Sequence, residues 1–224
     1  MEVFSMPKKA FLNLPGKKQD EFFDMALEVF AHQPYQQASL SALLKKAGMA
    51  KGTFYQYFSD KLDLYDYLVI NVFAMKQFYL KSRMPAHPDD FFRVFEILLR
   101  LETGFRLQHP SFHSLLSFAT DPRFSPFGQD RIDELTQQHQ QLLHKLLVRS
   151  QLKGSVVTHA DAKLVTFCCQ LMLEEFHRYV NQQIQQEKEA FSEASTSEKA
   201  DWIADSSRRF MNLFRRGLAV QKPV

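Results

Sequence analysis

Residues 39–61, SLSALLKKAGMAKGTFYQYFSDK, contain the pattern that decides the fold. The pattern predicts a short helix over residues 40–47, a tight turn, and a second short helix over residues 51–57. Gly48 lies in the turn, where one residue must adopt a positive φ angle, and glycine does so at little cost. Two short helices joined by a three- or four-residue turn that contains glycine are typical of the helix-turn-helix motif.

The apolar residues of both helices fall on one side of each helix. Phe54 and Phe58 lie four residues apart on the second helix and can close a small core. Ser39 stands where the first helix needs an N-cap. The buried stripe of the first helix, with i, i+3, i+4, i+7 spacing, consists of Leu40, Leu43, Leu44 and Ala47. The groups left on the second helix are an ammonium, a hydroxyl, an amide and phenols, which suit phosphates and base edges.

Residues 17–70 resemble the DNA-binding domain of the TetR (tetracycline-repressor-type) family of bacterial transcription regulators. The matching features are the helix KKQDEFFDMALEVFA, the tyrosine at position 35, and the run LLKKAGMAKGTFYQYFSDKLDLYDYL. The order Gly-x-x-Lys-Gly-Thr-x-Tyr-x-Tyr-Phe-x-x-Lys-x-x-Leu is more specific than a general helix-turn-helix pattern. The chain departs from the family at Gln33–Pro34, where the family often has glycine before the tyrosine.

The resemblance implies that the second helix is the recognition helix, whose N-terminal part usually enters the major groove. Lys51 and Thr53 stand at that end, although Thr53 can instead bond within its own helix. Gln56 can offer two amide bonds to adenine, or a single bond elsewhere. The predicted DNA-contacting residues are Ser39, Lys51, Gly52, Thr53, Tyr55, Gln56, Tyr57 and Lys61.

The tyrosines and the last lysine of this set have roles of their own. Tyr55 and Tyr57 occupy positions that in the TetR family often contact the DNA backbone or a thymine methyl group. For Tyr57, a place in the core against the first helix is an almost equal alternative. Lys61 follows Ser59, a predicted N-cap, so phosphate oxygens can meet its amine and the backbone donors of the next helix start. Lys61 is therefore predicted to clamp a phosphate.

The positive charge of the chain is concentrated around this motif. The formal net charge is +3, and residues 1–84 carry 11 lysines and arginines against 8 aspartates and glutamates. Residues 85–224 carry 17 of each sign. A basic surface attracts phosphate without regard to sequence. A few lysines decorate any exposed helix, so the charge supports nucleic-acid binding only together with the motif.

The sequence lacks the motifs that are typical of catalytic sites, metal sites and membrane-spanning segments. Cys168 and Cys169 are adjacent, so on a helix they point about 100° apart and cannot easily share a metal ion. There is no Cys-x-x-Cys, His-Glu-x-x-His or glycine-rich phosphate loop. No run of 18 apolar residues and no signal-peptide core is present. We expect a cytoplasmic protein that is not an enzyme and uses no cofactor or metal.

Helical periodicity continues to the C-terminus, which predicts an all-α fold. The resemblance implies an N-terminal three-helix helix-turn-helix domain and a larger C-terminal helical domain for ligand binding and dimerisation. We expect residues 1–16 to form a flexible arm and residues 17–62 the DNA-binding domain, whose last helix continues to about residue 84 as the connector. Residues 63–224 form the effector-binding and dimerisation domain. Thr158-x-x-Asp161 and Ser195-x-x-Glu198 resemble capping boxes that begin its last two helices.

Members of the TetR family usually carry an effector cavity in the larger domain. Aromatic and methionine side chains with few charges favour an apolar or aromatic effector, although plain core packing explains any single one of them better. The candidate lining residues are Phe91, Phe95, Phe105, Phe112, His113, Phe118, Phe167, Met172 and Phe176.

The last two helices of TetR-family subunits pack into a four-helix dimer interface, and the two long C-terminal helices predicted here match that layout. The alternative is that both helices only complete the subunit core. The candidate interface residues are Phe176, Tyr179, Phe210, Leu213 and Phe214.

These patterns together predict a homodimeric DNA-binding transcription regulator, a repressor rather than an activator, released from a palindromic operator by a hydrophobic small molecule. Its expected partners are double-stranded operator DNA, a second copy of the chain and a small apolar or aromatic effector, without a membrane. Two alternatives stay open. One is a helical dimeric interaction protein whose helix-turn-helix docks protein, and the other is a regulator of the same fold with no small-molecule effector.

Overall fold

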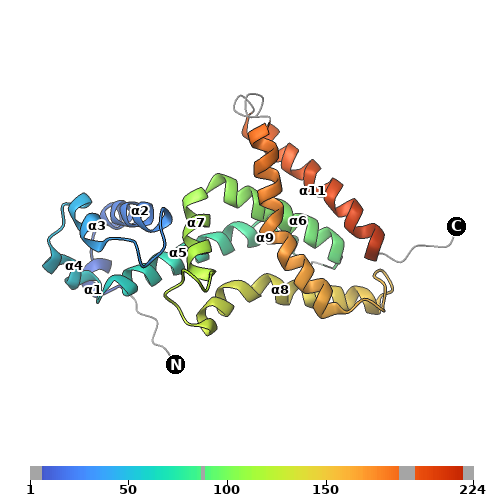
Figure 1. Ribbon diagram of the computed structural model, residues 1–224, viewed down its shortest axis with the longest axis horizontal. Coiled ribbons are helices and arrows are strands. Elements are labelled where there is room, and N and C mark those ends of the chain that lie inside the picture. Colours follow the sequence, from blue (N-terminus) through green and yellow to red (C-terminus); the bar gives the residue numbers. More distant parts are fainter. Residues whose placement is uncertain (1–6, 87–88, 187–194, 219–224) are drawn as a thin grey trace. The chain divides into compact units, whose positions relative to one another are not determined.

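Every regular element in the part of the chain that the computed structural model describes, residues 7–86, 89–186 and 195–218, is a helix (Figure 1). The predicted all-α class is confirmed. The helices are α1 (Lys9–Leu12), α2 (Gly16–Ala31), α3 (Leu40–Lys46), α4 (Lys51–Tyr57), α5 (Lys61–Lys81), α6 (Phe91–Gln108), α7 (Pro110–Thr120), α8 (Gln129–Leu152), α9 (Ala162–Gln186) and α11 (Thr196–Leu218). The sequence pattern predicts that α9 runs towards Ala190, a residue outside the described ranges.

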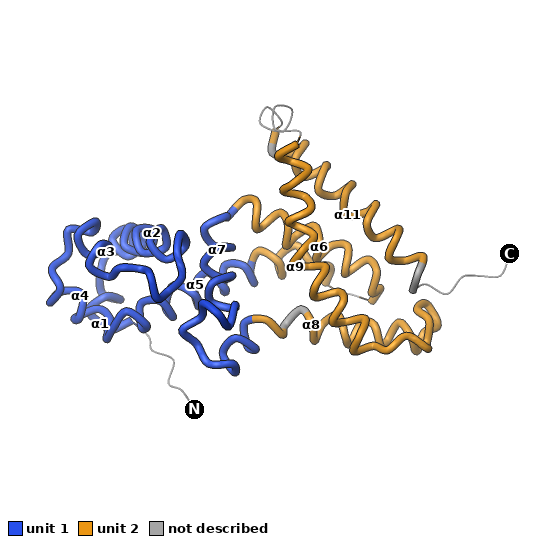
Figure 2. The backbone as a smooth tube through the Cα atoms, viewed as in Figure 1, with its two compact units in different colours: residues 1–78, 109–135 blue, residues 79–108, 136–224 orange. Residues whose placement is uncertain are grey.

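The chain divides into two compact units (Figure 2). Unit 1 combines Met1–Phe78 with His109–Leu135, and unit 2 combines Tyr79–Gln108 with Thr136–Val224. The helices α5 and α8 each contribute residues to both units. This division concerns packing; the predicted functional boundary near residue 62 stays a proposal.

Unit 1 is built around aromatic rings from helices that are distant in sequence. Phe54 and Phe58 are fully buried, as predicted, together with Leu43 of α3. Phe30 of α2 is fully buried too, and its ring centroid lies 5.2 Å from that of Tyr65 on α5. Helix α7 packs against α2, so the helix-turn-helix shares its core with residues from the middle of the chain.

Part of the stretch predicted as a flexible arm is anchored in unit 1, because Pro7 and Phe11 are buried while most of residues 8–16 are exposed. Lys9–Leu12 form α1, and the Phe11 side chain is fully buried. The ring centroid of Phe11 lies 5.0 Å from that of Phe58 and 5.5 Å from that of Tyr67. Residues 1–6 of the predicted arm lie outside the described residues.

Polar side chains cap the helices of unit 1, and one predicted cap is wrong. The Ser39 hydroxyl accepts a hydrogen bond from the Ala42 amide at 3.2 Å, as predicted for the N-cap of α3. For α5 the sequence pattern favours Ser59, but the Asp60 carboxylate accepts from the Asp63 amide at 2.9 Å. Ser59 donates its own amide to the Asp63 carboxylate at 2.6 Å. Asp60 is therefore the residue whose side chain meets the open amides of α5.

The caps of unit 2 follow the same chemistry. The sequence pattern favours Thr158 for α9, but the Asp161 carboxylate accepts from the Lys163 amide at 2.8 Å, directly before the helix. Ser195 and Glu198 form the predicted capping box of α11, because the Ser195 hydroxyl accepts from the Glu198 amide at 3.2 Å. The Glu198 carboxylate accepts from the Ser195 amide at 2.6 Å.

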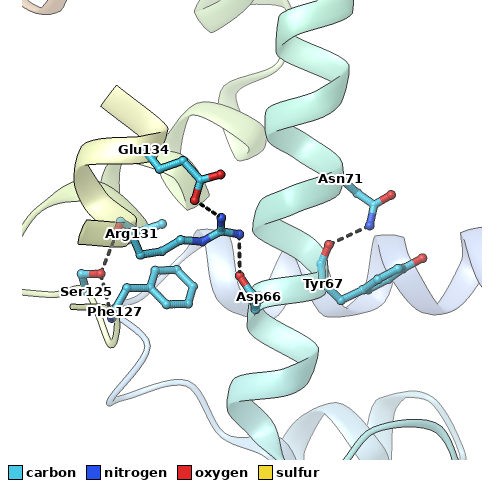
Figure 3. A network of polar contacts seen from close by, with 8 residues as sticks. Asp66, Tyr67, Asn71, Ser125, Phe127, Arg131 and Glu134 are labelled. Carbon is cyan, nitrogen blue, oxygen red and sulfur yellow. Dashed lines mark hydrogen bonds and ion pairs between the residues drawn. The ribbon is translucent and has the colours of Figure 1, made fainter. Parts of the chain in front are cut away.

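An ion-pair network fastens the start of α8 to α5 within unit 1 (Figure 3). Arg131 Nη2 lies 3.0 Å from Asp66 Oδ1, and Arg131 Nη1 lies 2.6 Å from Glu134 Oε2. The side chains of Arg131 and Asp66 are only 12% and 14% exposed. The ring of Phe127 lies beside the guanidinium, 6.0 Å from its central carbon to the ring centroid. The helix that follows the recognition helix is thereby joined to a segment about 65 residues later.

Candidate nucleic-acid interface

The turn between α3 and α4 has the predicted geometry. Gly48 adopts a φ of +59°, in the left-handed region where a side chain would be strained. The Met49 amide donates to the Leu44 carbonyl at 2.9 Å, and the Ala47 amide donates to the Leu43 carbonyl at 2.9 Å. These bonds close the end of α3 and direct the chain into α4 two residues later.

Helix α4 buries Phe54 and presents polar groups on its other faces. Lys51 and Gln56 are exposed, and the Tyr55 side chain is 43% exposed. Thr53 is half-buried, and Ser39, at the start of α3, is exposed. The outer face of α4 therefore offers an ammonium, a phenol and an amide, the donor groups that bind phosphates and base edges.

Tyr57 lies partly in the core, as the packing alternative predicts. Its ring is half-buried, and its centroid lies 5.7 Å from that of Phe11 in an edge-to-face arrangement. The neighbour is α1, which the sequence patterns do not predict.

Lys61 meets the loop that precedes α3. Its ammonium donates to the Tyr35 carbonyl oxygen and lies 4.2 Å above the centroid of the Tyr35 ring. Partial burial lowers the pKa of Lys61. An ammonium has three donors, so a phosphate contact remains open beside the bond to Tyr35.

Lys46, next to the turn, pairs with the carboxylate of Glu28 on α2. The hydrogen bond and charge of Lys46 lower the pKa of Glu28. Lys45 and Lys51 are exposed on either side of the turn. The lysines around the turn therefore differ in their availability to phosphate, since Lys46 already pairs with a carboxylate.

Gly52 is the second residue of the seven-residue helix α4, and its φ angle is not positive. A Cβ atom built at this position would have no atom within 4 Å. Glycine costs about 0.5–1 kcal/mol relative to alanine in a helix interior. Nothing in the described chain requires glycine here.

The candidate effector residues are divided between the two units. Phe112, His113 and Phe118 belong to unit 1, and the other six belong to unit 2. In unit 2 the rings of Phe91 and Phe95 are buried and stacked, with centroids 6.1 Å apart. Phe105 and Phe176 of the candidate set are also buried. Met172 is half-buried, and Phe167 is 52% exposed.

The candidate interface residues lie on α9 and α11. Phe176 is buried, with its ring centroid 5.2 Å from that of Phe210. Phe214 packs edge-to-face on Phe95 at 5.4 Å. Tyr179 and Leu213 are exposed. The set therefore combines rings that pack inside unit 2 with exposed side chains, Tyr179 and Leu213.

A buried charged cluster in unit 2 is missed by the sequence patterns. Arg106 Nε lies 3.7 Å from Glu102 Oε2, and Arg106 Nη1 lies 2.6 Å from His177 Nδ1. Burial and the charge of Arg106 lower the pKa of His177 to about 4. The i, i+4 spacing of Glu102 and Arg106 is visible in the sequence. The approach of His177 from α9 is not, because it depends on the packing of α6 against α9.

Within the described ranges, no three histidine, cysteine, aspartate or glutamate side chains are grouped so that they could hold a metal ion. Cys168 and Cys169 are free, and burial raises the pKa of Cys169 to about 12. None of the described helices is long and apolar enough to span a bilayer.

Residues 22–68, which include α3, the turn and α4, match the family model described as bacterial regulatory proteins, tetR family. Over these residues the chain is similar to the TetR family. The predicted resemblance is confirmed over these residues. The match begins within α2 and ends within α5, so α1 lies before the matched residues.

Two curated relatives and one solved structure extend the comparison. The chain is 37% identical over 94 residues to the uncharacterized HTH-type transcriptional regulator YvdT of Bacillus subtilis, covering 42% of this chain and 45% of that protein. It is 37% identical over 67 residues to the fatty acid metabolism regulator protein of the same organism, covering 30% and 32%. The chain thus spans less than half the length of either relative.

The crystal structure of a TetR family transcriptional regulator from Chloroflexus aurantiacus superposes with a TM-score of 0.80 and 24% identity. The match covers 96% of this chain and all of that chain. This likeness shows the fold, a TetR-type helix-turn-helix followed by a helical C-terminal part. YvdT and the Chloroflexus protein are named as transcriptional regulators and the third protein as a metabolism regulator, in agreement with the predicted regulatory class.

Proposed function

We propose that the chain is a homodimeric, sequence-specific DNA-binding regulator of transcription, a repressor released from a palindromic operator by an apolar or aromatic effector. The observation that carries the DNA-binding part is the outer face of α4 within a TetR-type domain. Lys51, Tyr55 and Gln56 are exposed on that face while Phe54 anchors the opposite side in the core.

Gly52 supports a close approach of a partner to this face. A glycine in a short helix costs stability, and no atom of the chain lies where its Cβ would be. We attribute the glycine at this position to a partner outside the chain. A DNA backbone that lies against the start of α4 accounts for it, because only glycine lets the two backbones approach closely.

Assignments within the interface follow the chemistry of each group. Lys51 and Thr53, at the N-terminal end of α4, enter the major groove, and Gln56 reads a base with its amide. Lys61 binds a phosphate with the donors that Tyr35 leaves open. Ser39, Tyr55 and Tyr57 contact the DNA backbone or a thymine methyl group.

The homodimer is supported by the outward-facing apolar groups of α9 and α11. Leu213 is 71% exposed, and Tyr179 is also exposed, on the last two described helices. A two-fold axis through such helices repeats the recognition helix for a palindrome with half-sites ~34–36 Å apart. The effector proposal rests on the aromatic side chains of unit 2, where Phe91, Phe95 and Phe176 belong to one buried apolar cluster.

Selection from a pool of random duplexes at near-physiological salt tests the proposal. The purified wild-type protein should enrich a palindromic consensus. Recovery of no motif, with only weak salt-sensitive binding, would favour an interaction protein whose helix-turn-helix docks protein. Release of the selected duplex by an apolar probe, such as a medium-chain fatty acid, would support an effector. If the protein stays bound to the selected duplex in the presence of every compound of a broad apolar and aromatic panel, a regulator without a small-molecule effector is favoured.

Gln56→Ala in the same selection tests direct base reading. Loss of a bidentate amide should relax the preference at one position of each half-site and cost about 1–3 kcal/mol there, while the other positions keep their preference. An unchanged consensus at every position would remove Gln56 from base readout.

A further inference from the structure

Lys8 lies beside the C-terminal end of the recognition helix α4, although it precedes that helix by more than 40 residues. The Lys8 amide donates to the Tyr57 carbonyl at 2.8 Å, and the Lys8 ammonium donates to the Tyr55 carbonyl at 2.9 Å. Helix α1 packs against α4. Both contacts come from a segment that lies outside the residues matched by the TetR family model.

These hydrogen bonds are made to backbone carbonyls at the end of α4 that have no hydrogen-bond donor within the helix. The last four carbonyls of a helix have no partner inside the helix. At the end of α4 the Phe58 amide donates to the Phe54 carbonyl at 2.9 Å. Lys8 donates to the carbonyls of Tyr55 and Tyr57. The last turn of α4 holds no basic residue. The Lys8 ammonium therefore supplies the positive charge that a helix C-terminus favours.

Helix α4 has only seven residues, and helices of this length are not stable without support from neighbouring groups. Its last turn carries Tyr55, Gln56 and Tyr57, so the placement of these side chains depends on how that turn is held. Phe54 and Phe58 hold its inner side in the core. Lys8 holds its backbone end.

Helix α1 is itself anchored firmly enough to act as a support. Phe11 is fully buried, and its ring centroid lies 5.9 Å from that of Phe22, 5.7 Å from that of Tyr57 and 5.0 Å from that of Phe58. The ring thus touches α2 and the end of α4 at once. Lys8 directly precedes α1, so its position relative to α4 is fixed by this ring.

We propose that Lys8 is a positioning residue that caps the recognition helix from outside and thereby sets the sequence preference of the DNA reader. The inference rests on the proposed DNA-binding function. It makes α1, which precedes the residues matched by the TetR family model, part of the reading machinery. A different role for Lys8, a direct phosphate contact, predicts another result in the same measurements.

Three variants separate these roles. Lys8→Met removes the ammonium and keeps the side-chain stem. Lys8→Pro removes the ammonium and the backbone donor, and the φ of −63° at Lys8 is one that proline adopts. Lys9→Met is the matched control, because it removes the same charge from the neighbouring residue. The measurements are affinity for the selected duplex, affinity for a random duplex, and the dependence of both on salt concentration.

For Lys8→Met we expect the affinity for the selected duplex to fall about fivefold relative to Lys9→Met, with the random-duplex affinity and the salt slope equal to those of Lys9→Met. Lys8→Pro should lose more, about tenfold or greater, and should give a relaxed consensus. An equal loss for both duplexes with a salt slope lowered by about one unit would overturn the proposal in favour of a phosphate contact. Affinities indistinguishable from those of Lys9→Met would overturn it as well.

Amide hydrogen exchange of the DNA-free protein keeps this test separate from the test of function. Lys8→Pro should speed exchange at the end of α4, residues 55–58, and leave exchange in α2 as in the wild type. Unchanged exchange in α4 would overturn the capping role whatever the protein binds. Faster exchange in a protein that selects no duplex would instead show that the cap exists and that the proposed function is wrong.

Discussion

At the scale of single residues, Gly52 shows a conflict between helix stability and recognition. Alanine at this position meets no atom within 4 Å, so Gly52→Ala should raise the free energy of unfolding by about 0.5–1 kcal/mol. The added methyl group should weaken binding to the selected duplex by about tenfold, because it stands where we place the DNA backbone. Thermal unfolding and a binding titration measure the two effects.

Gly16→Ala is the control for this pair of measurements. Gly16 is also open, but it begins α2 and is exposed, away from α4. Its substitution should change stability slightly and leave the affinity as it is. A Gly52→Ala protein that binds the selected duplex as tightly as the wild type would contradict the close approach of DNA at this residue.

His177 gives a residue-scale prediction for pH. Its pKa of about 4 in the folded protein is caused by burial and by the charge of Arg106, opposed in part by a hydrogen bond with the Glu174 backbone. The unfolded chain, with an ordinary histidine pKa near 6.5, binds more protons between these values. Stability should therefore fall as the pH drops from about 6.5 towards 4, by on the order of 1 kcal/mol after allowance for solvent screening.

His177→Gln removes the titratable imidazole and places a neutral amide near Arg106. The difference in melting temperature between pH 7 and pH 5 should be smaller in this variant than in the wild type. Equal differences in both proteins would mean that His177 does not titrate in this range, or that other groups carry the whole dependence.

At the scale of helices, the sequence patterns predict the long elements and miss what depends on distant partners. The core-facing side of α4 and the φ of Gly48 are local properties, and both are predicted correctly. Helix α1 has only four residues, too few for a periodic pattern, and it is held by the meeting of Phe11 with Phe58 and Tyr67. The cap of α5 is misplaced by one residue because Ser59 and Asp60 are both good N-caps, and only the helix start decides between them.

The pair of Asp66 and Arg131 makes a prediction about an element that the sequence patterns do not connect (Figure 3). Arg131→Met leaves the carboxylate of Asp66 poorly compensated in a largely buried place, and should destabilise the protein by roughly 3 kcal/mol. Asp66→Asn in the Arg131→Met background should recover a large part of that loss. Urea unfolding of the two single variants and the double variant measures the coupling.

Additive losses in the double variant would contradict a coupled pair. Glu134→Gln is the control, because Glu134 contacts the same guanidinium at 2.6 Å but its side chain is more than half exposed. A solvent-exposed pair contributes at most about 1 kcal/mol, so this variant should lose far less than Arg131→Met.

At the scale of the whole chain, the grouping of helices does not follow their order. Residues 109–135 return to the unit that contains the helix-turn-helix, after residues 79–108 have entered the other (Figure 2). This return depends on α7 packing against α2 and on the contact of Arg131 with Asp66. No local pattern encodes contacts between residues so far apart, so the sequence predicts the helices of this chain better than their grouping.

The homodimer is the remaining prediction at this scale. A substitution at Leu213 tests it with the smallest expected effect on the fold of the subunit. Phe210 touches Phe176 inside unit 2, so a charge at Phe210 would disturb the fold as well as an interface. Leu213 is 71% exposed, and Leu213→Asp should keep the melting temperature of the subunit while it separates the dimer. Leu152→Asp is the control, since Leu152 is 85% exposed at the end of α8 and the substitution introduces the same charge on another helix.

Sedimentation equilibrium and binding to the selected palindrome read out the result. Leu213→Asp should sediment as a monomer, and its affinity for the palindrome should fall by at least about tenfold, because each half-site is then bound without the help of the other. Its affinity for a single half-site should equal that of the wild type, since α4 is unchanged. A Leu213→Asp protein that remains a dimer would place the interface elsewhere, and a wild-type monomer that binds the full palindrome tightly would remove the need for one.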